Sequence, residues 1–170
     1  MKPEIKYGVL SAFLLIIWNI TQYFLGFHTI RLALGHYTGY AIYLILFISL
    51  YLGLKEKEVD YNGHFTLRKG IRSGLFQLVI IGIPASLFSF LYSYKINPLW
   101  VERLVIWQRE NNVNLAVLQI AANDQNAPTI ILSNTEVYLC INFLSIIIVG
   151  GLFSFLISMY LIGKTPKTKA

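Results

Sequence analysis

The sequence is poor in charged residues and almost free of cysteine. Asp, Glu, Lys and Arg make up 13% of its 170 residues, about half of the roughly 25% that is usual in soluble domains. Because Cys140 is the single cysteine, an intrachain disulfide is excluded. Cys140 stands inside an apolar run, where the expected role is that of a small buried hydrophobic side chain. Water is therefore not expected to be the main solvent of this chain.

The sequence also lacks the patterns by which catalytic and nucleic-acid-binding sites are recognised. The net charge is +6, but it comes with no long basic run and no interleaved basic and aromatic surface. We therefore expect no nucleic-acid partner. Metalloprotease, nucleophile-elbow and phosphate-loop motifs are missing as well. We predict no catalytic residues, no cofactor and no enzymatic activity.

Hydrophobic residues are abundant, at 56% of the chain, and they gather in four long stretches. Residues 7–27, 37–54, 73–94 and 137–163 carry no charge, and about 20 apolar residues in a helix cross a membrane. The predicted spans are residues 6–28, 36–54, 70–95 and 133–163. The predicted fold is all-α, an integral membrane four-helix bundle that forms a single domain over residues 1–170.

The basic residues orient this predicted bundle. Ten of them lie before the first span, around the loop of residues 55–69 or in the tail after residue 163. The other four are Arg31, Lys95, Arg103 and Arg109. Since basic residues concentrate on the cytoplasmic side, both termini and loop 55–69 are predicted to be cytoplasmic. The segment of residues 96–132 is then periplasmic, and the predicted location is the bacterial inner membrane.

Small residues predict where the helices approach closely. Gly70 and Gly74 in the third span, and Gly150, Ser154 and Ser158 in the fourth, recur every four positions. This spacing puts small side chains on one helix face and allows tight contact between membrane helices.

A helix is expected to follow the third span on the outer membrane surface. Asn97-Pro98 has the form of an N-cap followed by a proline at the first helical position. Residues 98–110 place mainly aromatic and aliphatic side chains on one side and charged ones on the other, as in helices that lie on membranes. The candidate surface for lipid or a partner protein consists of Ile96, Trp100, Val101, Leu104 and Trp107. Whether residues 111–127 are helical is left open.

Polar residues inside the spans form a second candidate site. They are Asn19, Gln22, Gln77 and Asn142. One interpretation is a polar seam along which a solute or lipid head group binds. The alternative is ordinary hydrogen bonding between membrane helices, which we favour from the sequence alone.

The histidines offer an alternative that we do not adopt. His28 and His36 flank one predicted outer loop, and with Glu102 or Glu110 they could hold a metal ion. Their separation of eight residues matches no recognised ligand motif. We expect interfacial histidines and no metal site.

Several short motifs resemble a known family in their order and spacing. They are EIKYGVLSAF at the start, Gly26-Phe27-His28, FTLRKGIRSGLF, residues 94–98 and Pro128-Thr129 before the last span. Together they resemble a family of small membrane proteins, known mainly from Bacteroidetes, with a domain of unknown function. The resemblance implies four helices and an inner-membrane location, and it suggests an envelope partner of the glycosyltransferase type. It implies no catalytic residue.

Three functional hypotheses follow. The leading one is a non-enzymatic accessory or scaffold subunit of an envelope complex, because the segment between spans three and four is long for a simple connection. The alternative is a small solute carrier or lipid-handling protein that uses the polar seam. The least supported is an enzyme that acts on a lipid-linked substrate with Glu102, Arg103, His28 and His36.

Overall fold

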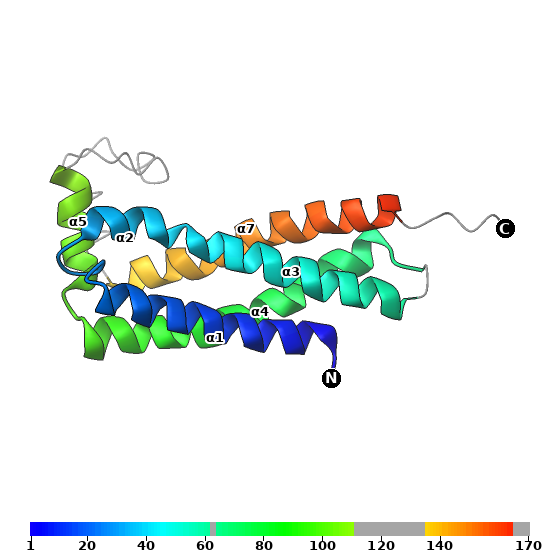
Figure 1. Ribbon diagram of the computed structural model, residues 1–170, viewed down its shortest axis with the longest axis horizontal. Helices are drawn as coiled ribbons and strands as arrows, with labels where there is room; N and C mark the ends of the chain where they lie inside the picture. The colour runs from blue at the N-terminus through cyan, green and yellow to red at the C-terminus, as the bar shows by residue number, and fades with distance from the viewer. Residues whose placement is uncertain (62–63, 111–134, 165–170) are drawn as a thin grey trace.

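The protein is a bundle of long helices, described by a computed structural model over residues 1–61, 64–110 and 135–164 (Figure 1). Its elements are α1 (Pro3–Phe24), α2 (Leu32–Gly39), α3 (Ala41–Asp60), α4 (Leu67–Leu91), the π-helical turn η1 (Tyr92–Ile96), α5 (Trp100–Glu110) and α7 (Thr135–Lys164). No strand occurs among these residues. The predicted all-α fold is therefore confirmed.

Four helical segments are long and apolar enough to cross a membrane: Pro3–Phe24, Leu32–Asp60, Leu67–Ile96 and Leu139–Gly163. The second joins α2 and α3, which are separated only at Tyr40. It is longer than the predicted residues 36–54 because backbone hydrogen bonding continues beyond the apolar stretch into polar sequence. The four helices match the expected multi-pass architecture.

The chain ends define two ends of the bundle. The base is the end where α1 begins and α7 ends, and α5 lies across the opposite end, here called the α5 end (Figure 1). At the base, Pro3 lies in the first turn of α1, where its missing N–H costs nothing. The side chain of Thr66 caps α4 by accepting from the backbone N–H of Lys69.

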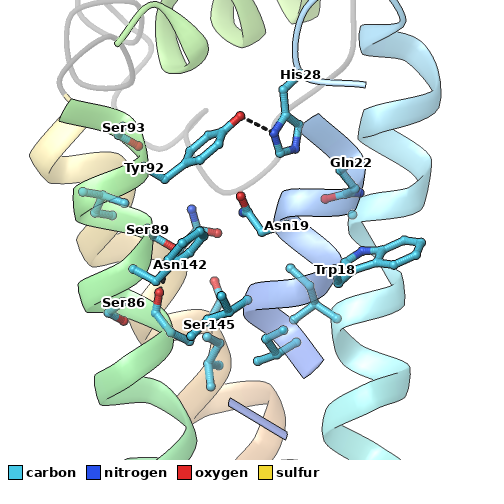
Figure 2. Close-up of a pocket in the computed structure, with 18 of the residues that line it drawn as sticks. Trp18, Asn19, Gln22, His28, Ser86, Ser89, Tyr92, Ser93, Asn142 and Ser145 are labelled. Carbon is cyan, nitrogen blue, oxygen red and sulfur yellow. Dashed lines mark hydrogen bonds between the residues drawn. The ribbon is translucent and has the colours of Figure 1, made fainter. Parts of the chain in front are cut away.

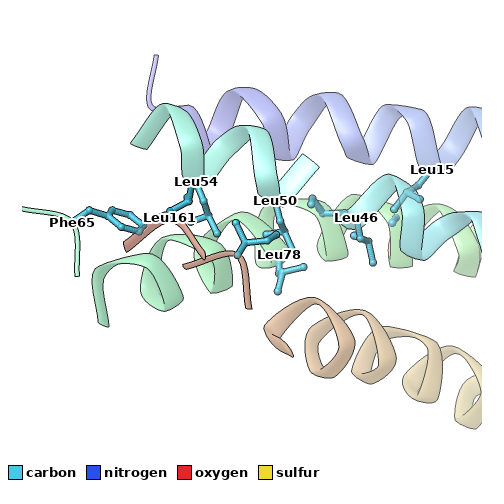
Figure 3. Close-up of a cluster of buried hydrophobic side chains, with 10 residues drawn as sticks. Leu15, Leu46, Leu50, Leu54, Phe65, Leu78 and Leu161 are labelled. Atoms are coloured by element: carbon cyan, nitrogen blue, oxygen red, sulfur yellow. The ribbon is translucent and has the colours of Figure 1, made fainter. Parts of the chain in front are cut away.

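A column of buried apolar side chains fills the middle of the bundle and its base half (Figure 3). Leu46, Leu50, Leu54, Leu78 and Ile81 have no exposed surface. They come from α3 and α4, and Ile157 and Leu161 of α7 complete the column. This packing closes the bundle between the base and the α5 end.

The predicted close contact between small residues is confirmed for α4 and α7. A Cβ atom added to Gly70 would collide with Ser158, and one added to Gly74 would collide with Ser154. Both serines are fully buried, and the Ser154 hydroxyl donates to the Gly70 carbonyl. Because Gly70 and Gly74 have no side chain, the two helices approach to hydrogen-bonding distance at these positions.

The expectation of a buried Cys140 is wrong, because its side chain is exposed on α7. An apolar run that spans a membrane has lipid-facing positions as well as interior ones. A cysteine in such a run can therefore face outward, as Cys140 does.

Candidate functional site

A pocket of about 340 Å³ lies inside the bundle near the α5 end (Figure 2). This volume is at the small end of the range for ligand-binding pockets, about 300–1,000 Å³. All the helices described contribute to its wall. Among the described residues, the non-aromatic polar side chains in the wall, apart from the histidines, are Asn19, Gln22, Ser86, Ser89, Ser93, Asn142 and Ser145.

A buried group of three polar side chains lies at the α5 side of the pocket. The Tyr92 hydroxyl and His28 Nδ1 are 2.6 Å apart (Figure 2). Asn97 Nδ2 donates to the same hydroxyl over 3.2 Å and to the His28 carbonyl over 3.4 Å. Since the hydroxyl accepts from Asn97, its own hydrogen is free for His28 Nδ1. These contacts join the α1–α2 loop to the end of the third span.

The His28 ring also packs against α5. Its centroid lies 4.0 Å from that of Trp100, and only 3% of the His28 surface is exposed. Burial disfavours the charged imidazolium and lowers the pKa of His28 to about 4. His28 is therefore neutral at physiological pH. The side chain of His28 lies in the protein interior because the loop folds inward.

The sequence before His28 explains this inward turn. Gly26 has φ of 74°, a left-handed conformation that favours glycine. The N–H of Phe27 bonds to the carbonyl of Gln22 and that of Gly26 to Tyr23. These are the two bonds of a Schellman motif, which ends α1 and reverses the chain.

Asn97 does not play its predicted N-cap role. The helix begins at Trp100, two residues later than the expected first helical position. The Asn97 side-chain amide instead donates to Tyr92 and His28, as described above. Satisfying buried groups from two elements takes precedence here over capping a helix end.

Two atoms on the α1 side of the pocket have no hydrogen-bond partner. They are Asn19 Oδ1, an acceptor, and Trp18 Nε1, a donor, and both are shielded from solvent. The Asn19 side chain points into the space below the His28–Tyr92 pair (Figure 2). Nearby Gln22 is different, since its Nε2 donates to Thr38 Oγ1 over 2.9 Å. Buried polar atoms without partners are rare in packed proteins.

The pocket ends at the apolar core. Leu15 and Ala85 belong both to its wall and to the buried column of Figure 3. Ile16, Phe143 and Ile146 add further apolar surface to the wall. The pocket thus combines polar groups with an apolar end.

The structure brings three of the four predicted seam residues to this pocket. Asn19, Gln22 and Asn142 line it. Gln77 does not: its Nε2 donates to the Ser49 carbonyl and hydroxyl over 2.9 and 2.8 Å. Leu78 and Ile81 belong to the apolar column, which separates Gln77 from the pocket. The four residues therefore do not form one continuous seam.

The residues predicted to form a lipid or partner surface do not form one exposed surface either. Trp100, Val101 and Leu104 are buried in a small cluster with Tyr92, so they are not an exposed surface. Trp107 lies against His36, with ring centroids 5.6 Å apart. Only Ile96 of the set is largely exposed, at 47%. Trp100, Val101 and Leu104 of α5 therefore pack onto the bundle.

Sequence reasoning missed a polar cluster at the base. Glu4 is buried, and its Oε1 accepts from Ser73 over 2.7 Å and from Lys57 over 3.1 Å. A more exposed pair, Lys6 and Glu56, lies 2.8 Å apart beside it. The charge sequence of the first helix gave no sign of this, because the partners lie more than 49 residues away.

Two of the residues considered for metal binding or catalysis, His28 and His36, line the same pocket. Over residues 1–61, 64–110 and 135–164, no three His, Cys, Asp or Glu side chains gather as metal ligands would. His28 is buried against Trp100, whereas Glu102 and Arg103 of α5 are exposed. His36 contacts the rings of Tyr37 and Tyr40.

Comparison with known proteins identifies a family. A family described as "Protein of unknown function (DUF4199)" matches residues 6–162. The chain belongs to this family. The DUF4199 match covers every residue of the pocket wall, and it confirms the expected membership of an uncharacterised family. No curated protein and no solved structure matches the chain.

Proposed function

We propose that this DUF4199 protein is a non-enzymatic membrane protein that binds a lipid or similar small amphiphile in the pocket at the α5 end. The observation that supports this is the pocket itself, about 340 Å³ between helices that are otherwise closely packed. Protein interiors contain few voids larger than a water molecule. A bundle that acted only as a scaffold has no need for such a space.

The proposed location is the bacterial inner membrane, with the base on the cytoplasmic side. Ten of the 14 basic residues flank the base in the sequence, and cytoplasmic flanks are rich in Lys and Arg. In this orientation the pocket lies toward the periplasmic side. An amphiphile from the outer leaflet would then have the shorter path to it.

Binding is favoured here over transport, the other form of the same hypothesis. The apolar column of α3, α4 and α7 closes the bundle below the pocket. Gln77 of the third span is bonded to Ser49 on the other side of that closure. The described part of the chain thus offers a site with one end closed.

Native mass spectrometry of the full chain, extracted in mild detergent, tests this proposal. The expected result is a bound molecule in the lipid mass range that survives purification. Ser145→Phe places a ring in the pocket wall and should remove that molecule. Leu144→Phe is the matched control, because Leu144 is 54% exposed and outside the wall. Unliganded wild-type protein, or equal retention in both variants, would contradict the proposal.

An accessory role is the second candidate, and one feature of α5 favours it. Glu102 and Arg103 are exposed on a helix that lies across the bundle end. This charged face could bind an envelope protein without disturbing the Trp100 cluster. A partner that co-purifies with wild type and is lost in the charge-reversed Glu102→Lys, Arg103→Glu variant would support it. Unchanged recovery of every partner would remove α5 from this role.

A further inference from the structure

The pocket wall indicates the chemical class of its occupant, an inference that rests on the proposed function. We infer that the occupant is an uncharged amphiphile with a hydroxyl-bearing head group, one that both donates and accepts hydrogen bonds. Three features of the wall carry this inference: its lack of charge, its two unpaired polar atoms and its apolar end.

Among the residues that the structure describes, the wall holds no Asp, Glu, Lys or Arg side chain. The titratable side chains of the wall, within residues 1–61, 64–110 and 135–164, are His28, His36 and three tyrosines. His28 Nδ1 is occupied by the Tyr92 hydroxyl, and the ring is enclosed by Trp100. A phosphate or an ammonium group in this space would therefore have no opposite charge beside it. Taking an unpaired charge out of water is strongly unfavourable, so charged head groups are disfavoured.

The two unpaired atoms determine which hydrogen-bonding groups the head group must supply. Asn19 Oδ1 needs a hydrogen-bond donor, and Trp18 Nε1 needs an acceptor. Both belong to neighbouring residues of α1 that line the pocket. A hydroxyl group is donor and acceptor at once. An ester or a hydrocarbon lacks the donor, and therefore leaves Asn19 Oδ1 unsatisfied.

The position of these atoms along α1 also orients the occupant. Leu15 lies one turn below Asn19 and belongs to the buried column. Phe143 and Ile146 of α7 provide further apolar surface in the same wall. The head group thus lies between Asn19 and the His28–Tyr92 pair, and the first carbons of the chain contact Leu15 and Ile146.

Three probes with the same 18-carbon chain separate the alternatives. Monooleoylglycerol carries two free hydroxyls and no charge, oleoyl lysophosphatidate adds a phosphate, and methyl oleate has no donor. Binding to the delipidated full chain is measured by quenching of tryptophan fluorescence and by native mass spectrometry. We expect monooleoylglycerol to bind about tenfold more tightly than methyl oleate, the difference that one well-made hydrogen bond provides. It should also bind more tightly than lysophosphatidate, whose charge would be left without a partner.

Two variants connect the preference to the named atoms. Asn19→Leu removes the acceptor and Trp18→Phe removes the donor while retaining an aromatic ring. Each should weaken monooleoylglycerol binding severalfold. Asn19→Leu should leave methyl oleate binding unchanged, because the ester has no donor for Asn19 Oδ1. Thr21→Val is the control, because it removes a hydroxyl from the same helix outside the pocket wall. Helicity and elution volume establish that each variant is folded.

The outcomes distinguish this inference from the proposed function. Tightest binding of lysophosphatidate, or equal binding of methyl oleate, overturns the head-group inference and leaves an amphiphile site in place. Saturable binding of none of the three by folded wild-type protein overturns both.

Discussion

At the scale of single residues, a cluster of buried polar side chains lies at each end of the bundle. At the α5 end, Tyr92 bonds to His28 and Asn97. At the base, Glu4 bonds to Ser73 and Lys57. A buried polar group costs free energy unless its partners are present. Each cluster therefore fixes the arrangement of the elements that supply its members.

His28 makes the stability of the protein depend on pH. Its ordinary pKa of 6.5 falls to about 4 in the folded protein. As the pH decreases from about 6.5 to 4, the unfolded chain takes up a proton that the folded chain does not. The contribution of neutral His28 to the free energy of unfolding is therefore complete above pH 6.5. It declines across this window by up to about 3 kcal/mol.

Thermal melting in detergent between pH 7.5 and 4.5 checks this prediction. His28→Gln has no titratable ring and should show a smaller fall in melting temperature over the same range. His64→Gln is the control, since His64 is exposed at the base. Equal pH dependence in wild type and His28→Gln would show that another group is responsible.

The two ion pairs at the base should differ in their contribution to stability. Glu4 and Lys57 are enclosed, with side chains 8% and 16% exposed, whereas Glu56 and Lys6 are 38% and 47% exposed. Glu4→Gln leaves Lys57 facing a neutral group and should cost about 1–3 kcal/mol. Glu56→Gln should cost less than Glu4→Gln, because exposed ion pairs contribute little to stability.

A double-mutant cycle measures the buried pair directly. Lys57→Met alone leaves Glu4 charged and unpaired, so the double variant Glu4→Gln, Lys57→Met should lose less than the sum of the two single losses. Strict additivity in melting experiments would mean that the 3.1 Å contact contributes nothing.

At the scale of the elements, the α4–α7 contact depends on the absence of a side chain at Gly70 and Gly74. Gly74→Ala puts a methyl group into Ser154 and should destabilise the bundle by about 1–3 kcal/mol. Gly163→Ala, where no atom lies within 4 Å, should be neutral or slightly stabilising. The combination Gly74→Ala, Ser154→Gly restores the space and should recover part of the loss. Failure of this rescue in melting experiments would contradict the steric explanation.

Composition and spacing were sufficient to predict the membrane-spanning helices and the close approach of α4 and α7 at Gly70 and Gly74. An apolar run of membrane length has few alternatives to a helix, and small residues four apart must share a face. The position of α5 was not predictable in the same way. Its apolar side is compatible with lipid or with the bundle end, and the Tyr92 and Trp100 cluster decides between them.

The pocket was predicted only in part, because its formation depends on how the helices pack against each other. Asn19, Gln22 and Asn142 lie in apolar stretches and stand out as polar residues. Whether such residues meet depends on how the helices rotate against each other, which no single helix specifies. Gln77 therefore pairs with Ser49, and His28 joins the pocket through the Gly26 turn.

At the scale of the whole molecule, the predicted topology places both termini in the cytoplasm. In a Cys140→Ala background, Val59→Cys at the base and Glu102→Cys on α5 are both at exposed positions. A membrane-impermeant maleimide added to spheroplasts should label the cysteine at position 102 and not that at 59. Labelling of both should follow permeabilisation. The reverse pattern would invert the proposed orientation and place the pocket toward the cytoplasm.

The central claim is that the space at the α5 end is occupied by an amphiphile. The most direct measurement is an experimental density map of the full chain in discs of its native membrane lipids, with a rigid fusion partner to aid alignment. We predict elongated density between Asn19 and Ile146, with its polar end beneath the His28–Tyr92 pair. A map in which α1 and α7 close together and Asn19 bonds to Asn142 would contradict the claim.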